Sequence, residues 1–155
     1  MNIASIISRI PFLVPKKSNT GVEHGKWGED IAAKKLEREG FAILERNARP
    51  CKSDRRLEID IIALDKLNNT VVFVEVKQHK SHWAYESSIR GVDRRKKKNL
   101  RTACNAWRRM HDWQGGYRFD VVEVFGTPES GRPPEIKHVE RVNLFAQKDK
   151  FVPWI

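Results

Sequence analysis

Two short apolar runs joined by one turn constrain this chain more than any other feature. The runs, Leu57 to Leu64 and Val71 to Lys77, are rich in Val, Ile and Leu and flank a turn that contains Asn68-Asn69. The connection is short enough for a hairpin, which makes the two strands antiparallel neighbours. With the turn centred just before Asn68, Asp60 lies opposite Glu75, and both side chains project from the same face. A register slip of one residue would separate them.

Periodic apolar residues on both sides of this hairpin predict further helices and strands. Thr20-Gly21-Val22-Glu23 has the capping-box pattern that opens a helix, and Gly40 provides a left-handed stop after about Glu39. The remaining elements are a strand at 41–44, a long helix at about 88–110, and strands at 119–125 and 136–142. The resulting order, αβββαββ, predicts an α/β fold with a mixed central sheet flanked by helices.

The positions of these elements also predict the domain organisation. The chain has 155 residues, enough for one domain, which we expect at 21–145 between an N-terminal arm and linker at 1–20 and a tail at 146–155. The arm places four isoleucines on one helical face before Pro11, namely Ile3, Ile6, Ile7 and Ile10. The sequence leaves two interpretations for this arm: it docks on the body of the protein or on a partner subunit, or it is a frayed tail. It is far shorter than the ~20 apolar residues of a membrane span, so no membrane association is expected.

Charge and cysteine content narrow the class of partner and the compartment. Thirty Lys and Arg against twenty Asp and Glu give a formal net charge of +10. Such a balance favours a polyanion, most often nucleic acid, although a basic protein can also simply be well solvated. Cys51 and Cys104 form no C-x-x-C pair and no disulfide framework, which predicts a reducing, cytoplasmic location.

Two carboxylates and one ammonium group converge at the end of the hairpin. Glu75 and Lys77 share one face because alternate residues of a strand point the same way, and the register brings Asp60 beside them. Charges in such an apolar hairpin are unfavourable unless they are paired or bind a metal. Mg²⁺ would relieve the repulsion between the carboxylates and could activate a water, while Lys77 could orient that water or offset transition-state charge. An ion-pair network without a metal is the second interpretation, and strand geometry leaves it open.

Glu29 adds a third carboxylate from the first helix. It precedes Ala32, Ala33 and Leu36 by three, four and seven residues, which places it on the inner stripe of that helix. A carboxylate facing a core needs a partner, and the metal site would supply one. The alternative is an acid near the helix N-terminus that interacts with the helix dipole, worth about 0.3–1 kcal/mol.

Basic residues gather in two segments that could contact phosphates. The candidates are Arg49, Lys52, Arg55 and Arg56 in the loop before Asp60, and Arg94, Arg95, Lys96 and Lys97 in the second long helix. Loop cations close to Asp60 are suited to guide a nucleic-acid backbone towards the site. The helical run wraps around most of the helix, so part of it is a solvated face.

Several stretches together resemble a known group of nucleases. They are 25–32, which contains Glu29, then 58–63, which contains Asp60, and 72–77, which ends in Glu75-Val76-Lys77, with Lys96 and 118–122. These stretches are similar to the PD-(D/E)xK nuclease superfamily, which includes restriction endonucleases and archaeal Holliday-junction resolvases. Within it, the chain most resembles the YraN-like family of endonuclease-like proteins.

The resemblance covers about 21–145 and implies a restriction-endonuclease-like core. It implies that Asp60 and Glu75 ligate Mg²⁺ or Mn²⁺, that Lys77 is the catalytic lysine, and that Glu29 is an additional acidic site residue. One departure concerns substrate contacts: Gln78-His79 follows the lysine, where a small or polar residue and then an arginine are usual.

Three functions follow from these observations. The first is a metal-dependent endonuclease that hydrolyses phosphodiester bonds in DNA, with branched or structured DNA and a homodimer taken only by analogy with junction resolvases. The second is a nucleic-acid-binding module that keeps the nuclease fold without cleaving independently. The third is an interaction protein whose acidic cluster is merely structural.

Overall fold

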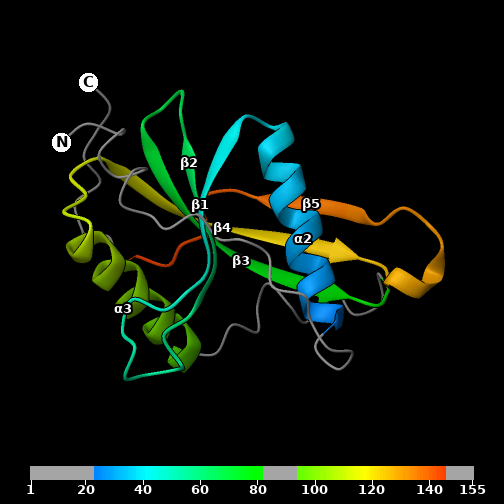
Figure 1. Cartoon of the computed structure of the whole chain (residues 1–155), viewed down its shortest axis with the longest axis horizontal. Helices are drawn as coiled ribbons and strands as arrows, with labels where there is room; N and C mark the ends of the chain where they lie inside the picture. Colours follow the sequence, from blue (N-terminus) through cyan, green and yellow to red (C-terminus); the bar gives the residue numbers. More distant parts are fainter. Residues whose placement is uncertain (1–22, 82–93, 146–155) are drawn as a thin grey trace.

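The computed structural model describes residues 23–81 and 94–145 and has the predicted order of helices and strands (Figure 1). The elements are α2 (Glu23–Arg38), β1 (Phe41–Ala48), β2 (Ile59–Asp65), β3 (Thr70–His79), α3 (Arg94–Met110), β4 (Gly116–Phe125), a short 3-10 helix η2 (Pro128–Ser130) and β5 (Glu135–Val139). The N-terminal arm, the expected first turns of the second long helix and the C-terminal tail lie outside the described residues. Neither α2 nor α3 has the length and apolar character that crossing a membrane requires.

The five strands form one open mixed sheet in the order β1-β2-β3-β4-β5. All neighbours are antiparallel except β3 and β4, which run parallel because the chain returns through α3 between them. In the hairpin, Ile61 pairs with Val74, and the register continues to Asp65 and Thr70. This is the register predicted from the turn, so the α/β fold with its mixed sheet is confirmed and is consistent with a restriction-endonuclease-like core.

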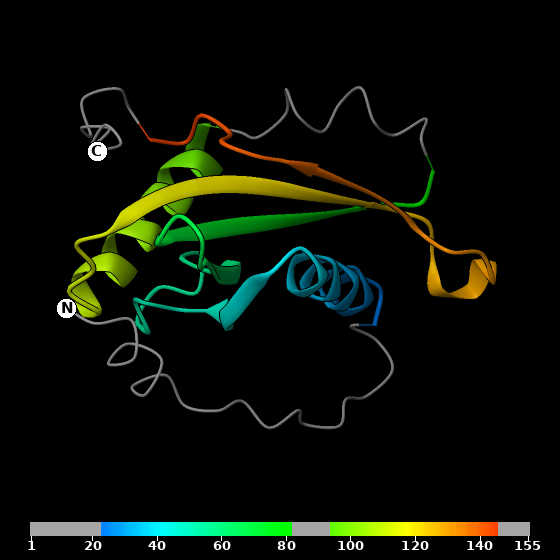
Figure 2. The same ribbon diagram turned by 90° about the horizontal axis from the view of Figure 1, so that it is seen from above.

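Helix α2 covers one face of the sheet, below β3 and β4 in the view of Figure 2. Its buried stripe, Ala32, Ala33 and Leu36, packs on alternate residues of the three central strands: Ile61, Ala63, Val72, Val74, Val122 and Val124. The helix ends as predicted, because Gly40 adopts a φ of +91° that a residue with a Cβ tolerates poorly.

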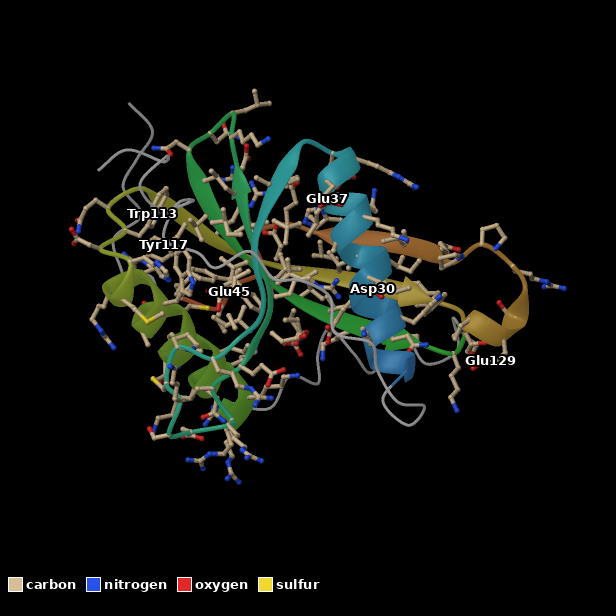
Figure 3. The ribbon with its side chains drawn as sticks, in the orientation of Figure 1. Asp30, Glu37, Glu45, Trp113, Tyr117 and Glu129 are labelled. Carbon is tan, nitrogen blue, oxygen red and sulfur yellow. The ribbon has the colours of Figure 1, made fainter. Side chains whose placement is uncertain are left out.

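Helix α3 covers the opposite face, because the strand residues that it contacts alternate with those under α2. Its buried residues, which recur at helical spacing along one side, are Leu100, Ala103, Cys104 and Trp107. The Trp107 ring lies edge-on to Phe73, with 5.7 Å between ring centroids. Its Nε1 donates a hydrogen bond of 3.0 Å to Glu45, which projects from β1 towards α3 (Figure 3).

Three strands differ by three or more residues from the prediction: β4 begins at Gly116 instead of 119, and β1 and β5 differ at their C-terminal ends, where polar contacts explain the difference. Strand β1 continues past Leu44 to Ala48 through a register shift, because its polar residues have partners. Glu45 accepts the hydrogen bond from Trp107, and Arg46 forms an ion pair of 2.7 Å with Asp30. Strand β5 ends at Val139 instead of continuing three residues further. Arg141 has a φ of +55° there and donates its backbone N–H to a carboxylate of β4, which stops the ladder.

Candidate functional site

Asp60 marks the point at which β2 and β3 separate. Backbone pairing between the two strands ends at Ile61 and Val74. One residue further on, Asp60 uses its carboxylate instead: Oδ2 accepts a hydrogen bond of 2.8 Å from the backbone N–H of Val76. This contact holds the carboxylate against the Glu75-Val76-Lys77 segment, so the predicted convergence of Asp60 with that segment is present in the structure.

Glu75 is a buried carboxylate whose ion-pair partner in the described part of the chain is Lys96. The residue is 5% exposed, and its Oε1 forms an ion pair with Nζ of Lys96 from the first turn of α3. The Lys96 side chain is about half exposed, at 49%. Helix α3 therefore supplies a cation to the acidic end of the hairpin, a contact between segments that are 21 residues apart in the chain.

Lys77 lies on the same side of β3 as Glu75. Both residues line a pocket whose floor is apolar and is formed by residues of α3, β4, β5 and the segment after β5. Lys97 lines the same pocket. Across the stretches 23–81 and 94–145, no hydrogen bond or ion pair engages the Lys77 ammonium group. It is thus placed beside a buried carboxylate at a pocket, where it can contact a bound ligand.

The electrostatics of Asp60 show how these charges act on one another. Burial and, after it, the negative charge of Glu75 are the largest causes that raise the pKa of Asp60 to about 7. The hydrogen bond from Val76 opposes this shift, the charge of Glu29 adds to it, and the charge of Lys96 reduces it. Glu29, Asp60, Glu75 and Lys96 therefore form one electrostatically coupled group.

Glu29 reaches this group only through its charge. Its Oε2 accepts a hydrogen bond of 2.9 Å from Nδ2 of Asn47 and lies 3.7 Å from the Arg46 guanidinium. The side chain is 19% exposed, so the predicted inner-stripe position is only partly inward. Among the described residues, Glu29, Asp60 and Glu75 do not bring three ligand atoms within 4.8 Å of one another.

The donor set nevertheless fits a hard divalent cation. Asp60 and Glu75 offer carboxylate oxygens, the ligand type that Mg²⁺ and Mn²⁺ take in proteins. After burial, repulsion from Glu75 is the largest cause that raises the pKa of Asp60, and a cation between the two groups would remove that repulsion. The Lys96 ammonium group already supplies positive charge at this position. Asp60 and Glu75 would hold such a cation, and the charge of Glu29 acts on Asp60.

In the loop before Asp60, two of the four arginine and lysine candidates for phosphate contact have acidic partners, and their role in nucleic-acid binding stays a prediction. Arg49 forms an ion pair with Glu58 at 2.6 Å, and Arg56 binds both carboxylate oxygens of Asp54. Hydrogen bonds from Arg56 lower the pKa of Asp54 to about 2. The loop cations without a partner in the described chain are Lys52 and Arg55, both exposed.

The basic first turn of α3 divides into two parts. Arg94, Arg95 and Lys97 are exposed, as expected for a surface that meets phosphates. Lys96 was expected to belong to the same surface, but its ammonium group reaches Glu75. Helical spacing could not reveal this contact, because a run of bases wraps around the helix without a distinguished face.

A second polar cluster was not predicted as a site. The carboxylate of Asp120, which is fully buried in β4, accepts hydrogen bonds from Arg118, from His138 at 2.8 Å and from the backbone N–H of Arg141 at 2.9 Å. Ligand atoms of Asp120, His138 and Glu140 lie within 4.8 Å of one another. However, arginine and histidine donors already surround the central carboxylate, which makes this cluster an ion-pair network that fastens β5 to β4. The sequence signal was an acid inside the apolar run 119–125.

Replacing His138 with glutamine should flatten the pH dependence of stability. Burial alone would lower the pKa of His138, but hydrogen bonds to Asp120 and Glu39 outweigh burial and raise it. Protonated His138 therefore stabilises the fold fully below its unfolded pKa, about 6.5, and this stabilisation disappears as the pH rises through the folded-state pKa. Between pH 5.5 and 9, wild type should lose about 1 kcal/mol more unfolding free energy than H138Q in urea titrations. Equal losses in the two proteins would contradict this role.

A buried pair on the Lys77 side of the sheet was also missed. Glu123 of β4 is fully buried, and its Oε1 lies 3.4 Å from Nε2 of His79. The His79 ring stacks on Phe125, while Gln78 donates a hydrogen bond of 3.1 Å to the carbonyl of Gly126. Gln78-His79, noted as a departure in sequence, thus contacts the end of β4. Glu123 interrupts an otherwise apolar run, which is the signal that could have identified it.

Comparison with known proteins identifies relatives of this chain. The family model described as "Uncharacterised protein family UPF0102" matches residues 28–124. A UPF0102 protein of Mycobacterium tuberculosis is 36% identical over 129 residues, which cover 81% of this chain and 96% of the relative. A UPF0102 protein of Halorhodospira halophila is 40% identical over 104 residues, covering 67% and 78% of the two chains. The match includes the β2–β3 hairpin with Asp60, Glu75 and Lys77, and the chain belongs to the UPF0102 family.

Proposed function

We propose that this protein is a Mg²⁺- or Mn²⁺-dependent endonuclease that hydrolyses phosphodiester bonds in DNA. The observation that carries the proposal is the arrangement at the end of the hairpin. Asp60 is held against Val76, Glu75 is buried, and Lys77 lies on the Glu75 side of β3 at a pocket. Two adjacent carboxylates with a lysine beside them are suited to phosphoryl chemistry with a metal.

The described residues would divide the chemistry between them. Asp60 and Glu75 would hold the cation, which when bound supplies an activated water and neutralises phosphate charge. Lys77 would donate a hydrogen bond to that water or to a non-bridging oxygen of the scissile phosphate, where negative charge increases during hydrolysis. Glu29 would add negative charge that favours cation binding, because its charge already acts on Asp60.

The positive surface supports nucleic acid as the substrate. Four exposed cations lie in segments that supply the acidic centre: Lys52 and Arg55 in the loop before Asp60, and Arg94 and Lys97 beside Lys96 in α3. If these cations neutralise several phosphates, the affinity for DNA should fall steeply as the salt concentration rises. Cations that are merely solvated would not produce this salt dependence. DNA, in a branched or otherwise structured form, is the substrate that we propose, and a homodimer would place two such sites on it.

Titration with Mn²⁺ tests the metal site. We expect wild type to bind Mn²⁺ and Glu75→Gln to bind it at least about tenfold more weakly, because a neutral amide replaces one of two anionic ligands. Glu37→Gln is the matched control, since Glu37 is an exposed acid on α2 (Figure 3). Isothermal titration calorimetry gives the dissociation constants. Equal binding by wild type and E75Q, or no binding by either, would refute the metal site.

A substrate panel tests cleavage itself. Linear duplex, single-stranded and four-way-junction DNA are incubated with wild type in Mg²⁺, in Mn²⁺ and in EDTA. We expect metal-dependent cleavage that is fastest on the junction. DNA binding with no cleavage under any metal would instead favour a binding module, a function compatible with the Lys96 ion pair that occupies Glu75.

A further inference from the structure

The ion pair between Lys96 and Glu75 places an ammonium group where a metal ligand is required. Glu75 is 5% exposed, and Lys96 is its ion-pair partner in the described chain. The charge of Lys96 also acts on Asp60, so the ammonium group lies close to both carboxylates. The Lys96 ammonium group therefore competes with a cation bound between Asp60 and Glu75 for Oε1 of Glu75.

Helix α3 itself does little to stabilise Lys96 in its position beside Glu75. The first turn of α3 contains Arg94, Arg95, Lys96 and Lys97 and no acidic residue. Positive charges at a helix N-terminus oppose the helix dipole. They also repel one another, since residues three and four apart are neighbours on the helix surface. Lys96 is thus held by the acidic residues Glu75 and Asp60 and not by its own helix, and a nucleic-acid phosphate would attract the same turn.

We propose that Lys96 is a positioning residue that acts as the resident counter-ion of Glu75 and is exchanged for the metal. Without metal, its ammonium group neutralises Glu75. When a divalent cation binds, Lys96 is released from Glu75 and turns to the phosphate backbone of the substrate beside Arg94 and Lys97. This inference rests on the proposed function and assigns to Lys96 a role in regulating that site.

The exchange has a thermodynamic consequence. If metal binding releases Lys96 for phosphate contact, a cation increases the affinity for nucleic acid and nucleic acid increases the affinity for the cation by the same factor. Removing the Lys96 ammonium group should therefore affect metal binding and its coupling to nucleic-acid binding in opposite directions. Metal alone should then bind more tightly, because it displaces no counter-ion and meets no like charge. The coupling between metal and nucleic acid should decrease at the same time.

Mn²⁺ titration of charge variants tests the first half of the inference. Lys96→Met should bind Mn²⁺ about three- to tenfold more tightly than wild type, as expected for loss of one positive charge beside a cation. Lys98→Met is the matched control: Lys98 is an exposed lysine of the same helix with no ion pair in the described chain, so its variant should bind as wild type does. Lys96→Arg keeps the charge and should also resemble wild type. Thermal unfolding in EDTA shows whether each variant is folded.

The outcomes separate this inference from the proposed function. If wild type binds Mn²⁺, E75Q does not, and K96M equals K98M, then the metal site stands and the exchange is refuted. Weaker binding by K96M would also refute it, since Lys96 would then support the metal. If neither wild type nor K96M binds Mn²⁺, both proposals fail.

A second measurement tests the coupling to nucleic acid. The dissociation constant of a short DNA duplex is measured with and without Ca²⁺, another hard cation that takes oxygen ligands. In wild type and K98M, Ca²⁺ should increase DNA affinity. In K96M that increase should be at least about threefold smaller, because no ammonium group is released. An undiminished increase in K96M would overturn the inference.

Discussion

Replacing Lys77 with methionine should reduce DNA cleavage by at least about 100-fold while leaving Mn²⁺ binding close to that of wild type. Lys77 lies on the Glu75 side of β3 at the pocket but is not among the proposed ligands. Removing one positioned donor from a site of developing negative charge typically lowers the rate by 10²–10³. Single-turnover cleavage of the best substrate from the panel measures the rate, and calorimetry measures metal binding.

Lys80→Met provides the control for this experiment. Lys80 follows the last residue of β3 and is exposed, so its variant removes the same charge without altering the pocket. It should retain cleavage within about threefold of wild type, since a single exposed cation contributes little beyond general phosphate attraction. If K77M cleaves as fast as K80M, the activity comes from another site or another protein.

Replacing Asp60 with asparagine should stabilise the metal-free protein at alkaline pH and abolish its stabilisation by Mg²⁺. Burial and the charge of Glu75 raise the pKa of Asp60 from 3.8 to about 7. A carboxyl whose folded pKa exceeds its unfolded pKa stabilises the fold most at low pH. That contribution is lost as the pH rises from about 4 through 7. At pH 8 wild type therefore carries the full penalty of a buried charge, which asparagine removes while its Oδ1 still accepts the Val76 hydrogen bond.

Thermal and urea unfolding in EDTA measure this effect. At pH 8, D60N should exceed wild type by on the order of 2 kcal/mol in unfolding free energy, and the difference should decrease towards zero near pH 4. Addition of Mg²⁺ should raise the melting temperature of wild type and not that of D60N. A D60N protein that is less stable than wild type at pH 8 would show that the Asp60 carboxylate supports the fold and is not held in an unfavourable environment.

Much of the fold could be predicted because it depends on local patterns. Apolar residues at helical spacing placed Ala32 and Leu36 of α2, and Leu100 and Trp107 of α3, on their buried stripes. The turn before Thr70 set the hairpin register, and that register brought Asp60 to the Glu75-Val76-Lys77 segment. Both inferences use interactions between residues close in sequence, where spacing determines geometry.

Charge pairing between distant segments could not be predicted in the same way. Glu75 meets Lys96 across α3 and β3, and Asp120 meets His138 across β4 and β5. In each case several basic residues nearby were equally plausible partners by spacing. The packing of helices and strands, which depends on the whole core, selected one of them. A buried acid in an apolar strand therefore predicts that a partner exists, but not which residue provides it.

For the acidic centre, the sequence by itself determined which side chains lie at the end of the hairpin, because strand alternation and one short turn leave little freedom. Only the tertiary structure decided their electrostatic state. It buried Glu75 and partly buried Asp60, kept Glu29 at the distance of a charge interaction, and brought Lys96 to Glu75. It also engaged Arg49 and Arg56 with acids, which removes them from the unpaired cations that could meet phosphate. The physical reason is that burial and long-range charge pairing depend on the packing of all the elements together.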